Sequence, residues 1–112
     1  MAQLFGKQAA LLVPTGTMAN LVSLMVNCRE KGDGAIIGDF SHLNMWERGN
    51  IAAAGSIMPI TIQNQCDGTI DLDDIDYVCK DQDPHHQVAR VICLESSHNQ
   101  CSGRVLSMKY IK

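Results

Sequence analysis

The sequence predicts an α/β domain built on a mostly parallel sheet with flanking helices. Three observations lead to this fold class. Short apolar runs alternate with amphipathic stretches of about 8 to 12 residues, which is typical of strand–helix–strand units. The composition, 46% hydrophobic and 19% charged, is that of a globular chain. A length of 112 residues allows one core of modest size and no second domain.

The first half of the chain alternates strand and helix signals. Residues 8–13 are apolar enough for a buried strand, and residues 14–17 have turn chemistry. Apolar side chains recur at helical spacing over residues 18–28, which predicts an amphipathic helix. Residues 35–37 predict a second short buried strand, and a helix or long turn is expected at residues 42–47.

The second half continues this alternation. A third strand is expected at residues 56–62, followed by a turn at residues 64–69. Residues 72–80 predict a helix, with Asp71 as its N-cap. Residues 88–95 form the clearest buried strand signal in the chain.

The remaining segments are a loop and the two ends. Residues 81–87 predict a surface loop in which His85 and His86 are exposed and inert. Residues 103–106 predict the start of another strand, and the sequence stops within what we expect to be the next helix. Because the first strand signal also comes almost at once, both ends give the expectation of a segment cut from a longer protein.

Composition disfavours several classes of function. A net charge of −3 with scattered Lys and Arg gives no basic surface for nucleic acid. No apolar stretch reaches the roughly 18 residues of a membrane span, and no signal peptide is recognisable, so we expect a soluble protein. Five cysteines, an odd number with no C-x-x-C pair, argue against a disulfide framework and a zinc ribbon. This cysteine pattern indicates that the protein resides in a reducing compartment. We expect a cytoplasmic location, and a mitochondrial one is left open.

Polar residues follow three of the expected strands. Thr15–Thr17 come after the first strand, Asp39, Ser41 and His42 after the second, and Glu95–Asn99 after the strand at 88–95. Ligands of open parallel sheets bind outside the carboxyl ends of the strands. The three groups can therefore face one crevice.

Each candidate residue has a structural and a functional interpretation. Thr15, Gly16 and Thr17 form either an ordinary helix N-cap or a cradle for an anion such as phosphate. His42 is either a cap-region residue making one hydrogen bond, or a base, a metal ligand or a platform for a flat ligand. Glu47 follows five positions later, which does not place it squarely on the same helix face, so its structural interpretation is a solvated helix residue.

His98 is a second histidine at the end of an expected strand. Because His42 has the same kind of position, chance placement becomes a weaker explanation for either histidine. A zinc site needs a third ligand, preferably with thiolates nearby. Cys101 is available, but nothing else in the spacing supports such a site. The sequence therefore predicts no metal site.

Four segments of the sequence resemble, in order and spacing, the threonine aldolases of the β-eliminating lyase group: QLFGKQAALLVPTGTMANLVSLMV, IIGDFSHLNMWERG, DGTIDLDDID and VICLESSHNQCSGRVL. The similarity covers nearly all 112 residues. It implies the fold type I, aspartate aminotransferase-like fold of pyridoxal-phosphate enzymes, with residues 1–112 as a fragment of the cofactor-binding large domain. It further implies pyridoxal 5′-phosphate as cofactor, retro-aldol cleavage of the small amino-acid substrate L-threonine or L-allo-threonine to glycine and acetaldehyde, and a homodimer or homotetramer.

The resemblance also implies residue roles. Thr15–Thr17 match the phosphate-binding turn, where Ser commonly stands at the first position. His42 matches the histidine that stacks on the pyridine ring, and Glu47 matches an acidic residue near the substrate pocket. His98 matches a histidine that contacts the substrate hydroxyl. Whether His98, His42 or a water takes the proton from that hydroxyl is left open.

The departures from the family pattern concern mainly what is absent. Mild ones are Gly49-Asn50 in place of a Gly-Gly pair and Glu95–Asn99 in place of ENTHN. The family's Schiff-base lysine, the aspartate that pairs with the ring nitrogen and the arginine that grips the substrate carboxylate lie beyond the matched segments. None of the lysines present occupies the Schiff-base position: Lys7, Lys31, Lys80, Lys109 and Lys112.

We therefore expect these 112 residues to be inactive on their own. The alternative is a non-catalytic binding or interaction module that retains the phosphate-binding turn. A flavodoxin-like nucleotide-binding domain is a third interpretation, disfavoured because no G-x-G-x-x-G or G-x-x-x-x-G-K-[ST] follows any expected strand.

Overall fold

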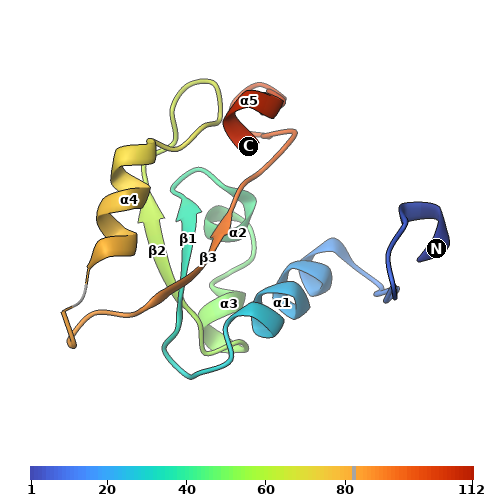
Figure 1. Ribbon diagram of the computed structural model, residues 1–112, viewed down its shortest axis with the longest axis horizontal. Coiled ribbons are helices and arrows are strands. Elements are labelled where there is room, and N and C mark those ends of the chain that lie inside the picture. The colour runs from blue at the N-terminus through green and yellow to red at the C-terminus, as the bar shows by residue number, and fades with distance from the viewer. Residues whose placement is uncertain (82) are drawn as a thin grey trace.

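A three-stranded parallel sheet forms the centre of the computed structural model, which describes residues 1–81 and 83–112. Strand β1 (Gly34–Gly38) lies between β2 (Met58–Ile62) and β3 (Ala89–Cys93). Both pairings are parallel. All three arrowheads in Figure 1 therefore point to one edge of the sheet. The predicted α/β class with a mostly parallel sheet is confirmed.

Helices cover both faces of this sheet. Helix α4 (Leu72–Lys80) lies on one face, and α1 (Gly16–Asn27) and α3 (Asn50–Ala53) lie on the other (Figure 1). Two short helices, α2 (His42–Met45) and α5 (Met108–Ile111), lie towards the edge where the strands end. A 3-10 turn, η1 (Gln3–Phe5), lies far from the sheet at the amino terminus.

The core follows from the alternation of side chains along β1, in which every residue is buried. Ala35 and Ile37 face α1 and α3, and pack with the buried side chains of Leu24, Cys28, Ile51 and Ile57. Ile36 faces α4 and packs with Ile62 and Ile70. A central strand buried on both faces has to be apolar throughout, which is why this short run is readable in the sequence.

Local signals explain the boundaries of α4 and the turn before it. The Asp71 side chain accepts a hydrogen bond from the backbone N–H of Asp73, so the predicted N-cap is confirmed. The turn at residues 64–69 is also confirmed, and it is closed by an antiparallel bridge between Asn64 and Ile70. Gly68 within it has φ +89°, a conformation that glycine adopts without strain.

Two predicted strands do not form. Residues 8–13 have no assigned strand, and Leu11 is 75% and Leu12 89% exposed. Residues 103–106 contribute only an isolated bridge between Arg104 and His98, and Val105 is 74% exposed. The reason is the same in both places: a strand is defined by hydrogen bonds to a neighbour, and no described strand lies beside either segment.

The strand predicted at 88–95 is shorter and less buried than expected. β3 is an edge strand in which half-buried and exposed residues alternate, and Ile92 remains 45% exposed. Helix α3 was not predicted. The loop at 81–87 behaves as expected in its described part, with the His85 and His86 side chains exposed and bonded to Asp83 and Asp81.

Among the described residues, the helices fall short of the length and apolarity that a bilayer crossing requires.

Candidate functional site

The site begins where the strands end. After β1, the chain passes through Asp39 and Ser41 into α2, and after β3 it passes through Glu95 into the loop that carries His98. Both connections lie at the edge to which the arrowheads point in Figure 1. Two of the three polar groups predicted from the sequence therefore meet at one edge of the sheet.

The carboxylate of Glu47 binds the imidazole of His42. Glu47 Oε1 lies 3.0 Å from His42 Nδ1, and it also accepts a hydrogen bond of 2.7 Å from the side-chain amide of Asn20 in α1. The Glu47 side chain is 0% exposed, whereas that of His42 is 49% exposed. The interpretation of Glu47 as a solvated helix residue is therefore wrong. Helix α2 ends at Met45, so the chain folds back and the spacing rule for helix faces no longer applies.

Within the described part of the chain, one oxygen of this carboxylate has no hydrogen-bond partner. Glu47 Oε2 is buried and accepts no hydrogen bond from any described residue. Buried carboxylate oxygens are normally satisfied, because removing one from water costs free energy that only a new partner restores. An unpaired oxygen beside a half-exposed imidazole is typical of a binding site.

At the start of α1, a capping hydrogen bond made by Thr15 lies next to a glycine, Gly16, that has open space around it. Thr15 Oγ1 accepts a hydrogen bond of 3.1 Å from the backbone N–H of Met18, so the N-cap interpretation is confirmed. A Cβ atom on Gly16 would meet no described atom within 4 Å, and the φ of Gly16 is not in the left-handed region. The fold itself therefore does not require glycine at this position. Thr17 follows in the first turn, where free N–H groups and the helix dipole favour an anion.

Glu95 connects the two histidine-bearing loops. Its Oε2 accepts a hydrogen bond of 2.7 Å from the backbone N–H of His42, and its Oε1 accepts one of 2.9 Å from the backbone N–H of Asn99. The Ser41 hydroxyl, which would ordinarily cap α2, donates instead to the carbonyl oxygen of Gly38.

His98 is buried, and its ring has no hydrogen-bond partner among the described residues. The residue is 1% exposed, and neither Nδ1 nor Nε2 makes a hydrogen bond to a described residue. Nδ1 lies 4.0 Å from Glu95 Oε1. The backbone of His98 is fixed by a hydrogen bond from its N–H to the carbonyl oxygen of Arg104, and Gly68 is close enough that a Cβ there would lie 3.2 Å from the Cβ of His98.

A small pocket of about 110 Å³ lies between these elements. Its lining comes from α1, α2 and the end of β3: Asn20, Ser41, His42, Leu43, Cys93, Leu94 and Glu95. Burial raises the pKa of the Cys93 thiol to about 11, so this wall of the pocket is uncharged at neutral pH. The pocket is therefore bounded by one half-exposed imidazole, one carboxylate, the polar side chains of Asn20 and Ser41, and uncharged side chains from Leu43, Cys93 and Leu94.

The structure brings some of the predicted site residues into contact and leaves others apart. His42 and Glu47 are in contact, and Thr15–Thr17 lie one helical turn before Asn20, which binds Glu47. Among the described residues, His98 is linked to His42 and Glu47 through Glu95, whose Oε1 lies 4.0 Å from His98 Nδ1. Asn20 was not predicted as a site residue, and Glu95 was expected at the crevice as part of the group Glu95–Asn99 but was given no role of its own. The available signal for Asn20 was a polar side chain early in the amphipathic stretch at residues 18–28.

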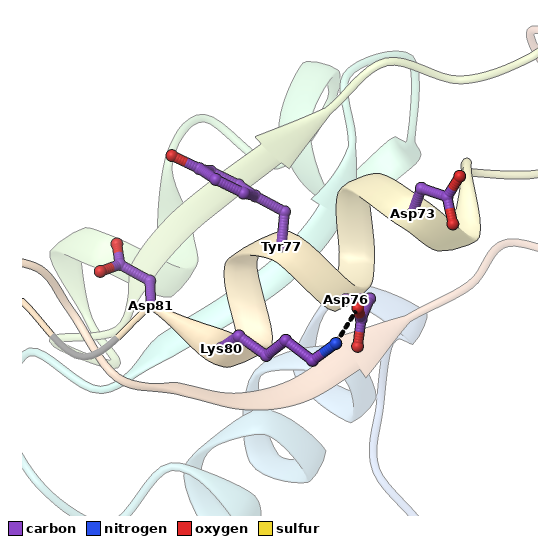
Figure 2. Close-up of a pocket in the computed structure, with 5 residues that line it drawn as sticks. All are labelled: Asp73, Asp76, Tyr77, Lys80 and Asp81. Atoms are coloured by element: carbon purple, nitrogen blue, oxygen red, sulfur yellow. Dashed lines mark hydrogen bonds and ion pairs between the residues drawn. The ribbon is translucent and has the colours of Figure 1, made fainter.

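A larger hollow of about 320 Å³ lies elsewhere, on the outer surface of α4. Figure 2 shows its five lining side chains, with Asp76 and Lys80 joined by an ion pair and Tyr77 extending from the helix. Tyr77 is 78% exposed, so the hollow is a shallow surface feature. Within residues 1–81 and 83–112, no cluster of three or more His, Cys, Asp or Glu side chains is arranged to hold a metal ion.

Comparison with known proteins gives a consistent family match. A family model described as beta-eliminating lyase matches residues 1–112. Low-specificity L-threonine aldolase 1 of Arabidopsis thaliana is 43% identical over 112 residues, which are 98% of this chain and 31% of that protein. Low specificity L-threonine aldolase of Escherichia coli strain K12 is 41% identical over 111 residues, which are 99% of this chain and 32% of that protein. The chain thus spans about a third of the length of these curated relatives.

A solved structure supports the fold. A Listeria monocytogenes protein described as an L-allo-threonine aldolase superposes with a TM-score of 0.75 at 24% sequence identity. The match covers 98% of this chain and 29% of that one. The arrangement of sheet and helices described above is therefore shared with part of a larger fold.

Proposed function

Because the chain belongs to the beta-eliminating lyase family, we propose that it forms the cofactor-binding part of an aldolase that cleaves L-threonine or L-allo-threonine to glycine and acetaldehyde. Enzymes of this family depend on pyridoxal phosphate. The observation that carries the proposal is the half-exposed His42 imidazole, held by the buried Glu47 carboxylate beside a pocket at the sheet edge.

The residues present fit this cofactor at its phosphate end. Gly16 stands at the first position of α1 with open space around it, and glycine there lets an anion approach the backbone closely. The neighbouring hydroxyl of Thr17 adds a donor. Because neither the turn geometry nor packing requires glycine at this position, close approach of a ligand explains it.

They also fit the cofactor at its ring. When bound, pyridoxal phosphate supplies an electron sink for the carbanion left by cleavage of the Cα–Cβ bond. The half-exposed imidazole of His42 offers a flat face for the ring, and Glu47 limits rotation of that imidazole by binding Nδ1. With its proton on Nδ1, His42 donates to Glu47 Oε1 and leaves Nε2 as an acceptor. Asn20 holds Glu47 in place from the α1 side.

His98 is the candidate for contact with the substrate hydroxyl. Its two ring nitrogens have no hydrogen-bond partner among the described residues, so they are available to accept or hold a proton. Three routes are compatible with the proposal: the proton of the substrate hydroxyl passes to His98, to His42 or to a water molecule.

The chain alone is proposed to be inactive. It spans about a third of its relatives, and none of its five lysines matches the Schiff-base position of the family. The exposed run that includes Leu11 and Leu12, and the open edge of β3, are surfaces that further chain would cover. We propose a homodimer or homotetramer for the complete enzyme, which light scattering measures directly.

A chimera tests the proposed activity. Residues 1–112 replace the matching segment of the Escherichia coli relative, and acetaldehyde release from L-threonine is measured with added pyridoxal phosphate. The expected result is cleavage by the chimera and none by the 112-residue chain. A chimera that folds and binds the cofactor but releases no acetaldehyde would contradict the proposal, and it would favour a non-catalytic binding module.

A further inference from the structure

Glu95 occupies an unusual position between the two histidines of the site. It follows the last strand of the sheet, and its side chain is 18% exposed. Each of its carboxylate oxygens accepts a backbone N–H, one from His42 and one from Asn99. A single side chain therefore bonds to two loops that belong to different strands.

The bond to His42 fixes the start of α2. The residue that precedes this helix, Ser41, turns its hydroxyl to Gly38 and leaves the first N–H of the helix for Glu95 at 2.7 Å. A hydrogen bond from a backbone N–H to a carboxylate is shorter and stronger than one between neutral groups. The backbone from which the His42 imidazole projects is thus held by a residue 53 positions away.

The second oxygen of Glu95 faces His98. Oε1 closes the loop by accepting the N–H of Asn99, the residue next to His98, and it lies 4.0 Å from His98 Nδ1. That nitrogen has no hydrogen-bond partner among the described residues. A carboxylate at this distance favours a proton on Nδ1, because the negative charge attracts a proton on the ring nitrogen that lies 4.0 Å away.

We propose that Glu95 is a positioning residue for both histidines, fixing the backbone of His42 and placing the proton of neutral His98 on Nδ1. His98 Nε2 is then left as the acceptor. The use of this acceptor towards a substrate hydroxyl rests on the proposed function, whereas the placement of the proton rests on Glu95 alone. In this role Glu95 acts through the two imidazoles.

The test uses the 112-residue chain, uniformly labelled with 15N and without cofactor. Two-bond 1H–15N correlation spectra at about pH 8 report which nitrogen of each neutral imidazole carries the proton. Hydrogen exchange reports the protection of the His42 and Asn99 amides. Wild type is expected to show His98 with its proton mainly on Nδ1.

Two substitutions at Glu95 distinguish the effect of its negative charge from the effect of its hydrogen-bond acceptors. Glu95→Gln keeps the volume and one carbonyl acceptor but removes the charge, so the His98 tautomer is expected to shift towards Nε2 while the amides lose at most about tenfold in protection. Glu95→Ala removes both acceptors, and His42 and Asn99 are expected to exchange more than about tenfold faster. Glu30→Gln is the matched control, since Glu30 is exposed and its hydrogen bond to Asp33 uses the backbone N–H.

A His98 tautomer that is the same in wild type and Glu95→Gln would overturn the proposal, and Glu95→Gln alone decides this if Glu95→Ala fails to fold. Because no cofactor or turnover is involved, failure of the chimera to cleave threonine leaves this test unaffected. A tautomer shift in an inactive chimera would contradict the proposed function only.

Discussion

Glu47 lies 3.0 Å from the His42 imidazole although five positions separate the two residues. The four-residue helix between them ends at Met45, and the chain then returns Glu47 to the buried side of the same site. The pair leaves the imidazole half-exposed, and one carboxylate oxygen has no hydrogen-bond partner among the described residues. Both features are expected of a binding platform for a flat ligand.

Removing the Glu47 carboxylate is expected to destabilise the chain. Glu47→Ala leaves the Asn20 amide without its acceptor in a part-buried position, and we expect the free energy of unfolding to fall by about 1 to 3 kcal/mol. Urea denaturation measures the change. The control is Asp76→Asn, which breaks an exposed ion pair with Lys80 and is expected to cost less than about 0.5 kcal/mol. Equal effects of the two substitutions would argue against a structural role for the buried carboxylate.

Substitutions at Thr15 and Gly16 are expected to distinguish the capping of α1 from ligand binding at its start. Thr15→Ala removes the bond to the Met18 N–H and should lower the free energy of unfolding by about 1 kcal/mol. Gly16→Ala meets no atom and no backbone strain, so stability should be unchanged or slightly higher.

The same Gly16→Ala variant should bind pyridoxal phosphate at least about tenfold more weakly, because the added methyl group occupies the space of the phosphate. Equilibrium dialysis against the cofactor measures the dissociation constant. Unchanged affinity would show that the open space at Gly16 is not used by the cofactor.

Asp33 is expected to make the fold sensitive to acid. Its carboxylate accepts the backbone N–H of Glu30 and lies 3.1 Å from Arg90 Nε, and these partners hold the pKa of Asp33 below its ordinary value, the Glu30 bond contributing most. A carboxyl with a lowered pKa stabilises the folded state fully above the ordinary aspartate pKa, and this contribution is lost as pH falls through the lowered value.

The corresponding measurement is the pH dependence of urea unfolding below about pH 5. Asp33→Asn is expected to flatten the loss of stability with acid relative to wild type. Glu30→Gln retains the backbone N–H and should leave the slope unchanged. A slope that is identical in Asp33→Asn and wild type would contradict the assignment.

The cysteines are expected to react with alkylating reagents at different rates. Burial raises the pKa of Cys93 to about 11, so only about one thousandth of this thiol is ionised at pH 8. Cys66 and Cys79 are exposed free thiols. Peptide mapping after iodoacetamide treatment should find these two modified first, and rapid modification of Cys93 would show that the pocket wall is more open than described.

The sheet was predictable where the sequence alone determines burial. β1 is apolar because both of its faces are covered, and α4 carries its own cap at Asp71. The predicted strand at residues 8–13 failed because strand formation depends on a neighbour that no local pattern reveals. β3 was expected to be fully buried, but its position at the edge of the described sheet leaves Ile92 exposed.

The candidate site was predictable in part for a similar reason. His42 and His98 follow strands, and strand ends are recognisable. The contact between His42 and Glu47 depends on where α2 stops, and the bonds made by Asn20 and Glu95 depend on tertiary packing. None of these leaves a periodic signal in the sequence.

The most direct measurement of the proposed site is kcat/KM for L-threonine cleavage by the chimera and by its His42→Ala and His42→Phe variants. Alanine removes the platform, and we expect a loss of about 100-fold or more. Phenylalanine keeps a flat face but loses the bond to Glu47, and we expect it to recover at least about tenfold of that loss. Equal activity of wild type and His42→Ala in a folded, cofactor-loaded chimera would contradict the assignment of His42 as the ring platform.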